Sequence, residues 1–163
     1  MQWEKITDII LIAALALLGV FAILGLTEWI RRKSLKKVDR ELLAMLPSLV
    51  LMAATYFIFD ELLILNTRPN GSGEPSFPSS HTMATTTIFL MAIIALPKYV
   101  KNQPLRIVLD VVMLILIALV SVGRVAANMH WASDVIAALI FSVIFAALYL
   151  LILKLKKKEP NHA

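Results

Sequence analysis

Five long apolar runs dominate this chain and constrain what it can fold into. Three of them, at 9–26, 42–59 and 135–153, contain no charged residue, and the other two carry ionisable groups only toward one end. A helix of about 20 mostly apolar residues is long enough to cross the hydrocarbon core of a bilayer. The sequence therefore predicts five membrane-spanning helices, at about 6–30, 42–65, 80–97, 104–123 and 131–154.

The composition supports a membrane protein and excludes most soluble classes. Of the 163 residues, 60% are apolar and 17% are charged, whereas an average soluble domain has about 45–50% apolar and about 25% charged residues. The mean hydropathy is +0.82. The absence of cysteine excludes disulfides and thiolate metal sites. We expect residues 1–163 to form a single all-α integral membrane domain, a compact bundle of about five transmembrane helices.

The basic residues are distributed unevenly between the two sides of this expected bundle. Five spans place the connections 31–41 and 97–106 and the tail 154–163 on one side, and these hold 13 of the 16 Lys and Arg residues. Because an excess of Lys and Arg marks cytoplasmic loops, we expect the N-terminus outside and the C-terminus in the cytoplasm. Topology and attraction to anionic lipid explain these basic clusters, so we expect no nucleic-acid partner. The outer side keeps only Lys5, Arg68 and Arg124.

The first outer connection, 66–80, is long and polar. Twelve of its 15 residues are Asn, Thr, Pro, Gly or Ser. Structureless loops of this length are uncommon in compact proteins and are usually functional or disordered. The loop ends in Pro78, Ser79, Ser80 and His81 directly before an apolar run, which is the pattern of a helix start. The free N–H groups and positive dipole of such a terminus suit a phosphate, and a simple helix cap is the alternative.

The second outer connection, 123–131, and the helix after it hold Arg124, His130 and Asp134. If the fifth helix starts near Asn128, His130 and Asp134 stand at positions i and i+4 and share a face. The carboxylate could then fix the tautomer of the ring and leave its other nitrogen free as a nucleophile or base. A structural pair is the alternative here, as an interfacial anchor is for Arg68. The assembly of all these groups on one face favours a functional site.

Together these residues resemble the type 2 phosphatidic acid phosphatase superfamily of membrane lipid phosphatases. That family shows three motifs, KxxxxxxRP, PSGH and SRxxxxxHxxxD, and the resemblance covers roughly residues 42–155. The matching residues are Arg68 and Pro69 in the first motif, Pro78, Ser79 and His81 in the second, and Arg124, His130 and Asp134 in the third.

The chain departs from the family pattern at three motif positions and in its number of spans. Glu61 stands where the family has its lysine, Ser80 replaces the glycine, and Gly123 replaces the serine before the arginine. The family core usually has six spans, whereas we expect five here. A lysine neutralises phosphate charge and a glutamate would repel it. We therefore expect either that Glu61 points away from the phosphate, for example to pair with an arginine, or that the activity is altered.

The resemblance implies a reaction through a phosphohistidine, with no metal and no cofactor. His130 would be the nucleophile, Asp134 would orient its ring, and His81 would act as general acid and then general base. The groups implied to hold the phosphoryl oxygens are Arg68, Arg124, Ser79 and the backbone N–H groups of Ser80 and His81.

The expected function is a lipid phosphatase whose site faces outward from a plasma membrane, with a membrane lipid phosphate as the substrate and the lipid bilayer as its surroundings. The short chain and the outward site suggest a multi-pass protein of a bacterial cell membrane. The preferred substrate is undecaprenyl diphosphate, which would become undecaprenyl phosphate, and phosphatidic acid and phosphatidylglycerol phosphate are alternatives. Vanadium haloperoxidases share the site pattern but are soluble. A non-catalytic lipid-binding or transport protein on the same scaffold is the alternative from a different class.

Overall fold

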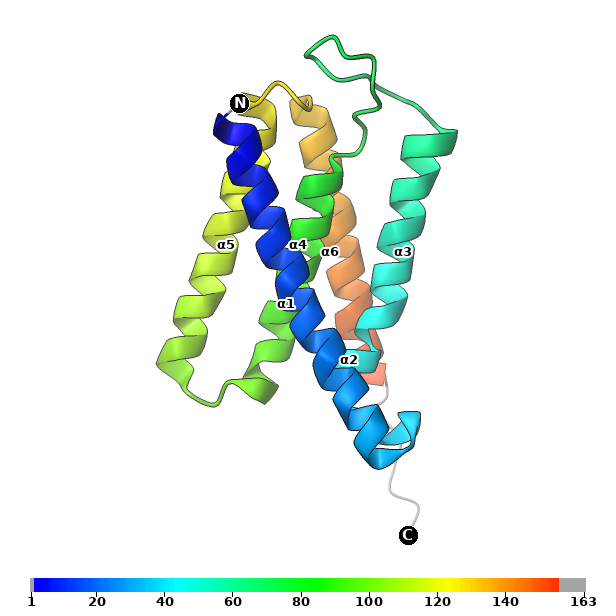
Figure 1. Cartoon of the computed structure of the whole chain (residues 1–163), viewed down its shortest axis with the longest axis vertical. Helices are drawn as coiled ribbons and strands as arrows, with labels where there is room; N and C mark the ends of the chain where they lie inside the picture. The colour runs from blue at the N-terminus through cyan, green and yellow to red at the C-terminus, as the bar shows by residue number, and fades with distance from the viewer. Residues whose placement is uncertain (1, 156–163) are drawn as a thin grey trace.

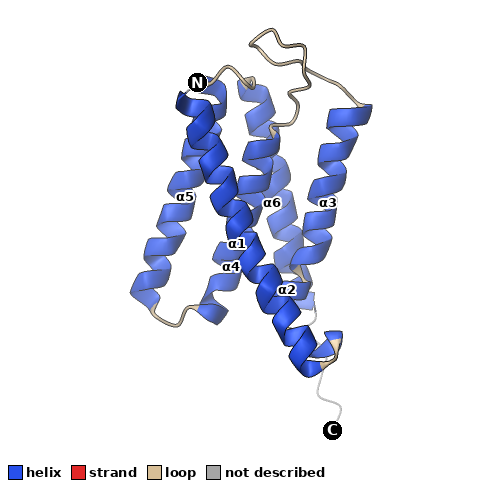
Figure 2. Cartoon of the chain, viewed as in Figure 1, coloured by secondary structure: helices blue, strands red, loops and turns tan. Residues whose placement is uncertain are grey.

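The computed structural model describes residues 2–155, which form helices joined by loops (Figure 2). Among the described residues, five helical runs are long and apolar enough to cross a membrane. The prediction of an all-helical membrane protein with five spans is confirmed. The elements are α1 (Gln2–Arg32), η1 (Leu35–Lys37), α2 (Arg40–Leu43), α3 (Met45–Phe57), η2 (Ile58–Leu62), α4 (Ser80–Tyr99), α5 (Gln103–Ala126) and α6 (Ala132–Leu155).

The helix α4 lies at the centre of the bundle and packs against α1, α3, α5 and α6 (Figure 1). Of the most apolar stretch of α4, 61% is buried inside the protein, against 11% for α5. Its mean hydropathy is correspondingly the lowest of the five spans, 1.4 against 2.7 for α5. A helix that faces protein on most sides needs fewer lipid-compatible side chains, so α4 can carry polar residues such as Thr82 and Thr85, which are fully buried.

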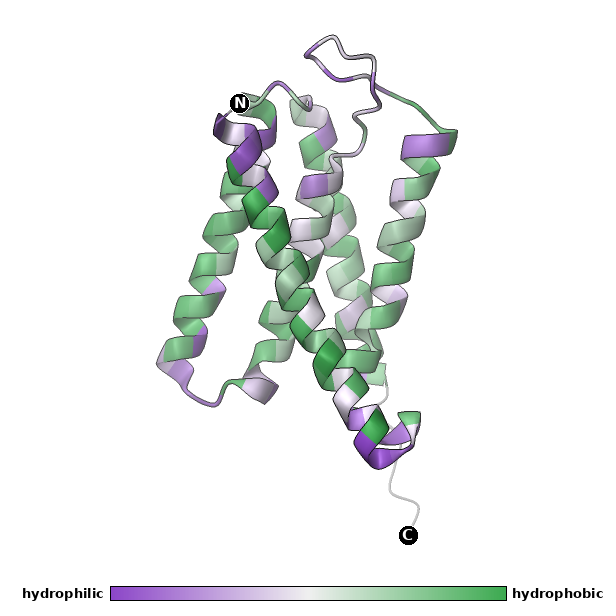
Figure 3. Ribbon diagram, viewed as in Figure 1, coloured by the Kyte–Doolittle hydropathy of each residue, from purple (hydrophilic) through white to green (hydrophobic). Residues whose placement is uncertain are grey.

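Many large apolar residues of α1, α3, α5 and α6 are exposed, while hydrophilic residues gather at the two ends of the bundle (Figure 3). Inside the bundle, serine hydroxyl groups form hydrogen bonds between helices, in addition to the van der Waals packing of their side chains. Ser48 of α3 donates to the Phe145 carbonyl of α6 at 2.9 Å, and Ser142 of α6 donates to the Met83 carbonyl of α4 at 3.0 Å. Such contacts are a common link between helices in membranes.

The two polar connections noted in the sequence lie at the same end of the bundle, together with the start of α1 (Figure 1). We call this the site end. The connections 33–39 and 100–102 lie at the opposite end, which we call the basic end. The end of α6 at Leu155 is also there, so α1 begins and α6 finishes on opposite sides, as an odd number of spans requires. The assignment of the site end to the outer face stays a prediction.

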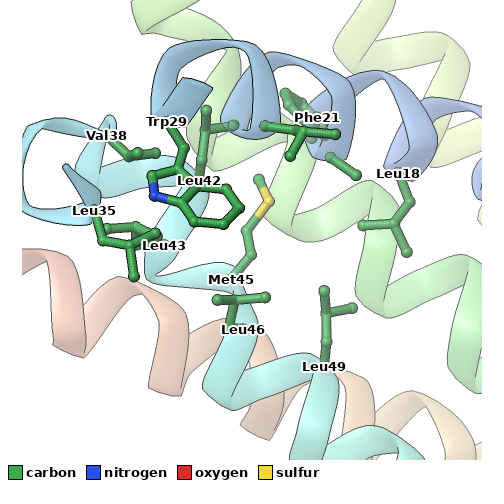
Figure 4. A pocket seen from close by; sticks show the side chains of 13 residues that line it. Leu18, Phe21, Trp29, Leu35, Val38, Leu42, Leu43, Met45, Leu46 and Leu49 are labelled. Carbon is green, nitrogen blue, oxygen red and sulfur yellow. The ribbon is translucent and has the colours of Figure 1, made fainter. Parts of the chain in front are cut away.

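A cavity of about 280 Å³ lies between α1, α2 and α3 toward the basic end (Figure 4). Phe21, Trp29, Leu42 and Met45 are among its lining residues, and none of the residues that line it is ionisable. It holds no group that could carry out acid–base or nucleophilic chemistry.

Candidate active site

The first polar connection, residues 63–79, folds back on itself as a hairpin. Gly71 and Gly73 have φ values of +78° and +76°, a backbone region that glycine adopts far more readily than other residues. The backbone contacts that close the hairpin are a pairing of Thr67 with Pro75, a hydrogen bond from Arg68 N–H to the Glu74 carbonyl (3.0 Å) and one from Ser76 N–H to the Asn66 carbonyl (3.0 Å). The hairpin thereby carries Ser76 toward the second polar connection.

The second connection begins after α5, where Asn128 takes a φ of +57° and breaks the helical geometry. The N–H of His130 returns to the Arg124 carbonyl at 3.3 Å. The helix α6 begins only at Ala132, and the Asp134 carboxylate accepts from the Trp131 N–H at 2.9 Å just before it. The condition of a helix start near Asn128 is therefore not met, whereas the predicted start of the span at 131 lies one residue from the observed start. His130 lies in the loop ahead of the helix.

His130 is 3% exposed, and both ring nitrogens have defined neighbours. Nδ1 lies 2.7 Å from the Ser76 carbonyl, and because a carbonyl can only accept, Nδ1 carries the hydrogen. Nε2 is then the bare nitrogen, and it accepts from Arg124 Nη2 at 3.3 Å. Burial, and second the charge of Arg124, lower the pKa of His130 to about 4, although the Ser76 hydrogen bond acts to raise it. The ring is neutral near pH 7, with a free lone pair on Nε2, which is the state that a nucleophile needs.

Asp134 is fully buried, and its carboxylate contacts both the polar hairpin and the loop that holds His130. Its Oδ2 lies 3.9 Å from His130 Nδ1, too far for a hydrogen bond. Its Oδ1 accepts from the Asn66 side chain at 3.0 Å, which ties the hairpin to the start of α6. The close hydrogen bond that orients the His130 ring comes from the Ser76 carbonyl. Asp134 thus acts on His130 through its charge and through the loop that it holds in place.

Arg124 is 2% exposed and connects α5 with α1. Its Nη1 lies 3.5 Å from Thr7 Oγ1 and 3.7 Å from Asp8 Oδ1. Its Nε is buried and has no hydrogen-bond partner among residues 2–155. The close packing of α5 against α1 also explains why glycine stands at position 123, where the family pattern has serine. A Cβ at Gly123 would lie 2.6 Å from Thr7 Cγ2, so a side chain there would force the two helices apart.

The start of α4 is held against α6 by backbone and side-chain contacts. The N–H of Ser79 donates to the Asp134 carbonyl at 3.2 Å, and its hydroxyl donates to Thr82 Oγ1 at 3.0 Å. Ser80 is the first helical residue, so its N–H and that of His81 have no partner within the helix. Both N–H groups stand at the positive end of the helix dipole, which favours an anion.

His81, the second residue of α4, is connected to Arg124 by Asp8 of α1. Its Nε2 lies 3.0 Å from Asp8 Oδ1, and the same oxygen lies 3.7 Å from Arg124 Nη1. Arg124 in turn contacts His130. The structure therefore brings together three of the residues singled out in the sequence, His81, Arg124 and His130, with Asp8 between the first two.

Arg68 is tied within its own hairpin. Its Nη1 lies 2.5 Å from Glu74 Oε2, and its Nε is buried with no hydrogen-bond partner in the described part of the chain. The positive charge of Arg68 nevertheless contributes to the lowering of the pKa of His130. Arg68 thus adds positive potential to the site without contacting either histidine.

Glu61 lies in η2 and is exposed. Within residues 2–155 the two arginines at the site end pair with other acids, Arg68 with Glu74 and Arg124 with Asp8. The suggested pairing of Glu61 with an arginine is therefore not found there. Its carboxylate is likewise absent from the charges that shift the pKa of His130.

Four residues of the site were missed in the sequence. Asn66 and Ser76 lie in the polar loop. Asn66 donates to the carboxylate of Asp134, which is distant in the sequence, and Ser76 contacts His130 through its backbone carbonyl, which has no sequence signature. Thr7 and Asp8 lie at the start of the first span. Asp8 did carry a signal, since it is a carboxylate at the end of a span on the same side as both polar connections.

Comparison with known families agrees with this geometry. A family model described as the PAP2 superfamily matches residues 55–158, more than half of the chain. The chain belongs to the PAP2 superfamily. The matched range contains His81, Arg124, His130 and the other motif residues, and it leaves out α1. The resemblance noted in the sequence is confirmed.

A solved structure shows the same PAP2 architecture. It is the first transmembrane PAP2 type phosphatidylglycerolphosphate phosphatase from Bacillus subtilis, with a TM-score of 0.67 and 20% sequence identity. The alignment covers 99% of this chain and 78% of that chain. At this identity the similarity concerns the fold, and it supports the assignment of the chain as a multi-pass membrane protein. A search of curated protein sequences finds no significant match.

Proposed function

We propose that this PAP2 protein is a lipid phosphatase that works through a phosphohistidine at the outer face of a membrane. The observation that carries the proposal is the bare Nε2 of His130, buried against the Arg124 guanidinium and fixed by the Ser76 carbonyl. A neutral ring with one nitrogen tied and the other beside a phosphate-binding cation is prepared for attack on phosphorus.

In the proposed first step, His130 Nε2 attacks the phosphorus and the P–N bond forms as the bond to the lipid oxygen breaks. His81 gives a proton to that oxygen. In the second step, water attacks the phosphohistidine, His81 takes the proton from the water, and the P–N bond breaks to release phosphate. General acid–base assistance of this kind contributes roughly 10²- to 10⁴-fold.

Positive groups converge on the place where phosphoryl oxygens would lie. Arg124 and Arg68 supply two guanidinium groups, and the start of α4 supplies the N–H groups of Ser80 and His81. Phosphoryl transfer is catalysed mainly by positioning and by charge stabilisation. These groups can supply both, so we propose a metal-independent reaction with no cofactor.

The lipid tail has a place beside the site. A cavity of about 330 Å³ opens between α1, α3 and α4, and its lining includes His81 and Ser80 together with Leu11, Leu15 and Met52. Its apolar walls suit the first part of an acyl or prenyl chain, with the head group at the histidines. The preferred substrate is undecaprenyl diphosphate at the outer face of a bacterial plasma membrane. Phosphatidylglycerol phosphate is the second candidate, because the structurally similar protein acts on it.

The test is phosphate release by the purified protein in detergent, with excess chelator present. Undecaprenyl diphosphate, phosphatidic acid and phosphatidylglycerol phosphate are offered in parallel, with His130→Ala as the matched variant. We expect release from at least one lipid and its loss in the variant, and the fastest lipid identifies the substrate. Release from none of them, or equal release by His130→Ala, would contradict the proposal and favour a non-catalytic lipid-binding member of the fold.

A further inference from the structure

The helix α1 reaches into the site with polar side chains that lie outside the region matched to the family. Asp8 places Oδ1 3.0 Å from His81 Nε2 and 3.7 Å from Arg124 Nη1. Thr7 beside it is fully buried, with Oγ1 3.5 Å from Arg124 Nη1. The PAP2 match begins only at residue 55, so Thr7 and Asp8 lie outside the matched region and outside all three motifs.

The contact with Asp8 determines which nitrogen of His81 is available for chemistry. An ionised carboxylate can only accept, so Nε2 of His81 carries the hydrogen in this contact. The other ring nitrogen, Nδ1, is buried and has no hydrogen-bond partner in the described part of the chain. Buried polar atoms are nearly always paired, and an exception in a cluster of catalytic groups indicates a place for a ligand.

The two histidines therefore share one arrangement with their nitrogens exchanged. In His130, Nδ1 is tied to the Ser76 carbonyl and Nε2 is free to attack. In His81, Nε2 is tied to the Asp8 carboxylate and Nδ1 has no protein partner. The difference lies in the partner's charge. A neutral carbonyl suits a ring that must stay unprotonated, whereas a carboxylate stabilises a ring that must hold an additional proton.

We propose that Asp8 is the positioning residue for His81, a role that rests on the phosphatase function proposed above. Asp8 holds the Nε2–H throughout and balances the charge of the doubly protonated ring. The proton on Nδ1 then passes to the leaving oxygen as the P–O bond breaks. In the second step Nδ1 takes a proton from the attacking water. Asp8 does not contact the substrate in this proposal; it acts on the reaction through His81, while the same carboxylate also lies 3.7 Å from Arg124 Nη1.

This role predicts a defect that depends on the leaving group. An alkoxide oxygen, as in phosphatidic acid, is strongly basic and needs the proton from His81 as the bond breaks. A nitrophenolate is a weak base and leaves without such help. Loss of Asp8 should therefore slow formation of the phosphohistidine from the first kind of substrate and spare its formation from the second, while hydrolysis of the phosphohistidine is the same for both.

The experiment compares Asp8→Asn with the wild type on phosphatidic acid and on para-nitrophenyl phosphate. For Asp8→Asn we expect kcat/KM on phosphatidic acid to fall about 10- to 100-fold and kcat/KM on para-nitrophenyl phosphate to stay within about 3-fold, because kcat/KM reports only the steps up to release of the leaving group. Asp8→Glu, which keeps the carboxylate, should recover part of the loss. Glu4→Gln is the matched control, because it removes an acid one turn away on α1 that makes no ion pair with the site histidines.

Equal loss of kcat/KM on both substrates would show a structural role and overturn the proposal, as would no loss of kcat/KM on either. An effect of Glu4→Gln as large as that of Asp8→Asn would also overturn it, since the effect would then be general electrostatics. Failure of the phosphatase function itself looks different. In that case the wild type releases no phosphate from either substrate and His130→Ala changes nothing.

Discussion

The two ends of the bundle both contain clusters of acidic and basic side chains, but the two clusters differ in how completely their polar atoms are hydrogen-bonded. At the basic end, Lys98 lies between Asp39, at 3.0 Å, and Glu41, and the Tyr149 hydroxyl donates to the Glu41 carbonyl. The Glu28 carboxylate accepts from the Asp39 N–H at 2.7 Å. These groups satisfy one another and hold α1, α2, α4 and α6 together.

At the site end, the charged groups converge but leave atoms without partners. The buried atoms with no hydrogen bond among residues 2–155 include Nε of Arg68, Nε of Arg124, Nδ1 of His81 and Oγ of Ser76. Unsatisfied buried polar atoms cost folding free energy, which a protein tolerates at sites that bind a ligand. The contrast teaches that convergence of charge marks no site by itself. Thr85, Thr86 and Thr87 of α4 and Asp110 of α5 also carry buried oxygens without a hydrogen bond, but in residues 2–155 the buried guanidinium and imidazole nitrogens without a partner all lie at the site end.

The largest expected effect is the loss of the nucleophile. His130→Ala should lower kcat by on the order of 10³-fold or more, because within residues 2–155 His130 Nε2 is the ring nitrogen that is hydrogen-bonded to Arg124. Phosphate release from the lipid substrate measures it, and the thermal midpoint checks that the variant folds. Turnover within about 10-fold of the wild type in a folded variant would remove His130 from the mechanism.

The second largest effect concerns the cation of the site. Arg124→Lys keeps the charge but loses the planar fork that contacts His130 Nε2 and faces Thr7. We expect kcat/KM to fall about 10²-fold and the inhibition constant for vanadate to rise, since vanadate mimics the five-coordinate phosphoryl group. An unchanged vanadate constant would place the phosphate away from Arg124.

The titration of His130 should report the same environment. Because its pKa is lowered to about 4, the ring stays neutral as the pH falls from 7, and the lone pair on Nε2 is lost only below about pH 4. The decrease of kcat/KM toward low pH that is due to His130 should have its midpoint near pH 4. The ionisation of the substrate phosphate is titrated separately so that its contribution to the profile can be subtracted. A midpoint assigned to His130 near the ordinary value of about 6.5 would contradict the buried, cation-flanked position.

At the basic end the expected effect is on stability alone. Lys98→Met removes the centre of the ion-pair cluster with Asp39 and Glu41. Because Lys98 is 36% exposed, we expect a loss of only about 1 kcal/mol in the free energy of unfolding. Thermal unfolding in detergent measures the loss, and kcat should not change. A fall in kcat at a temperature where the variant is fully folded would mean that the basic end affects catalysis at the site end.

The smallest effect should follow from Glu61→Lys, which restores the lysine of the family pattern. Glu61 is exposed and pairs with neither arginine of the site, so we expect KM to change less than about 2-fold. The same assay on the same lipid measures it. A clear fall in KM would show that residue 61 reaches the phosphate.

Much of the fold could be predicted from the sequence, because a membrane span depends on local hydropathy. The second span ends at Leu62, slightly before the predicted boundary at 65, and the other boundaries differ by a few residues. Motif spacing also identified His81, Arg124 and His130 before any contact was known. These features depend on neighbours in sequence or on a known pattern.

The remaining parts of the site depend on contacts between distant segments. Asp8 meets His81 across 73 positions and Asn66 meets Asp134 across 68, so neither pair leaves a local pattern. Ser76 acts through a backbone carbonyl, which any residue could supply. The predicted start of the last span at 131 is one residue from the observed start of α6 at Ala132, but the position of His130 in a loop depends on the positive φ of Asn128, which is a property of the folded chain.

The most direct test of the central claim is to trap the covalent intermediate. The protein is mixed with a substrate carrying a radioactive terminal phosphate and is quenched in alkali, in which a phosphohistidine survives, and the labelled peptide is then mapped. The account predicts label on His130 in the wild type, more label in His81→Ala if release of the intermediate becomes slower, and none in His130→Ala. Label on another residue, or rapid turnover with no label on His130, would contradict it.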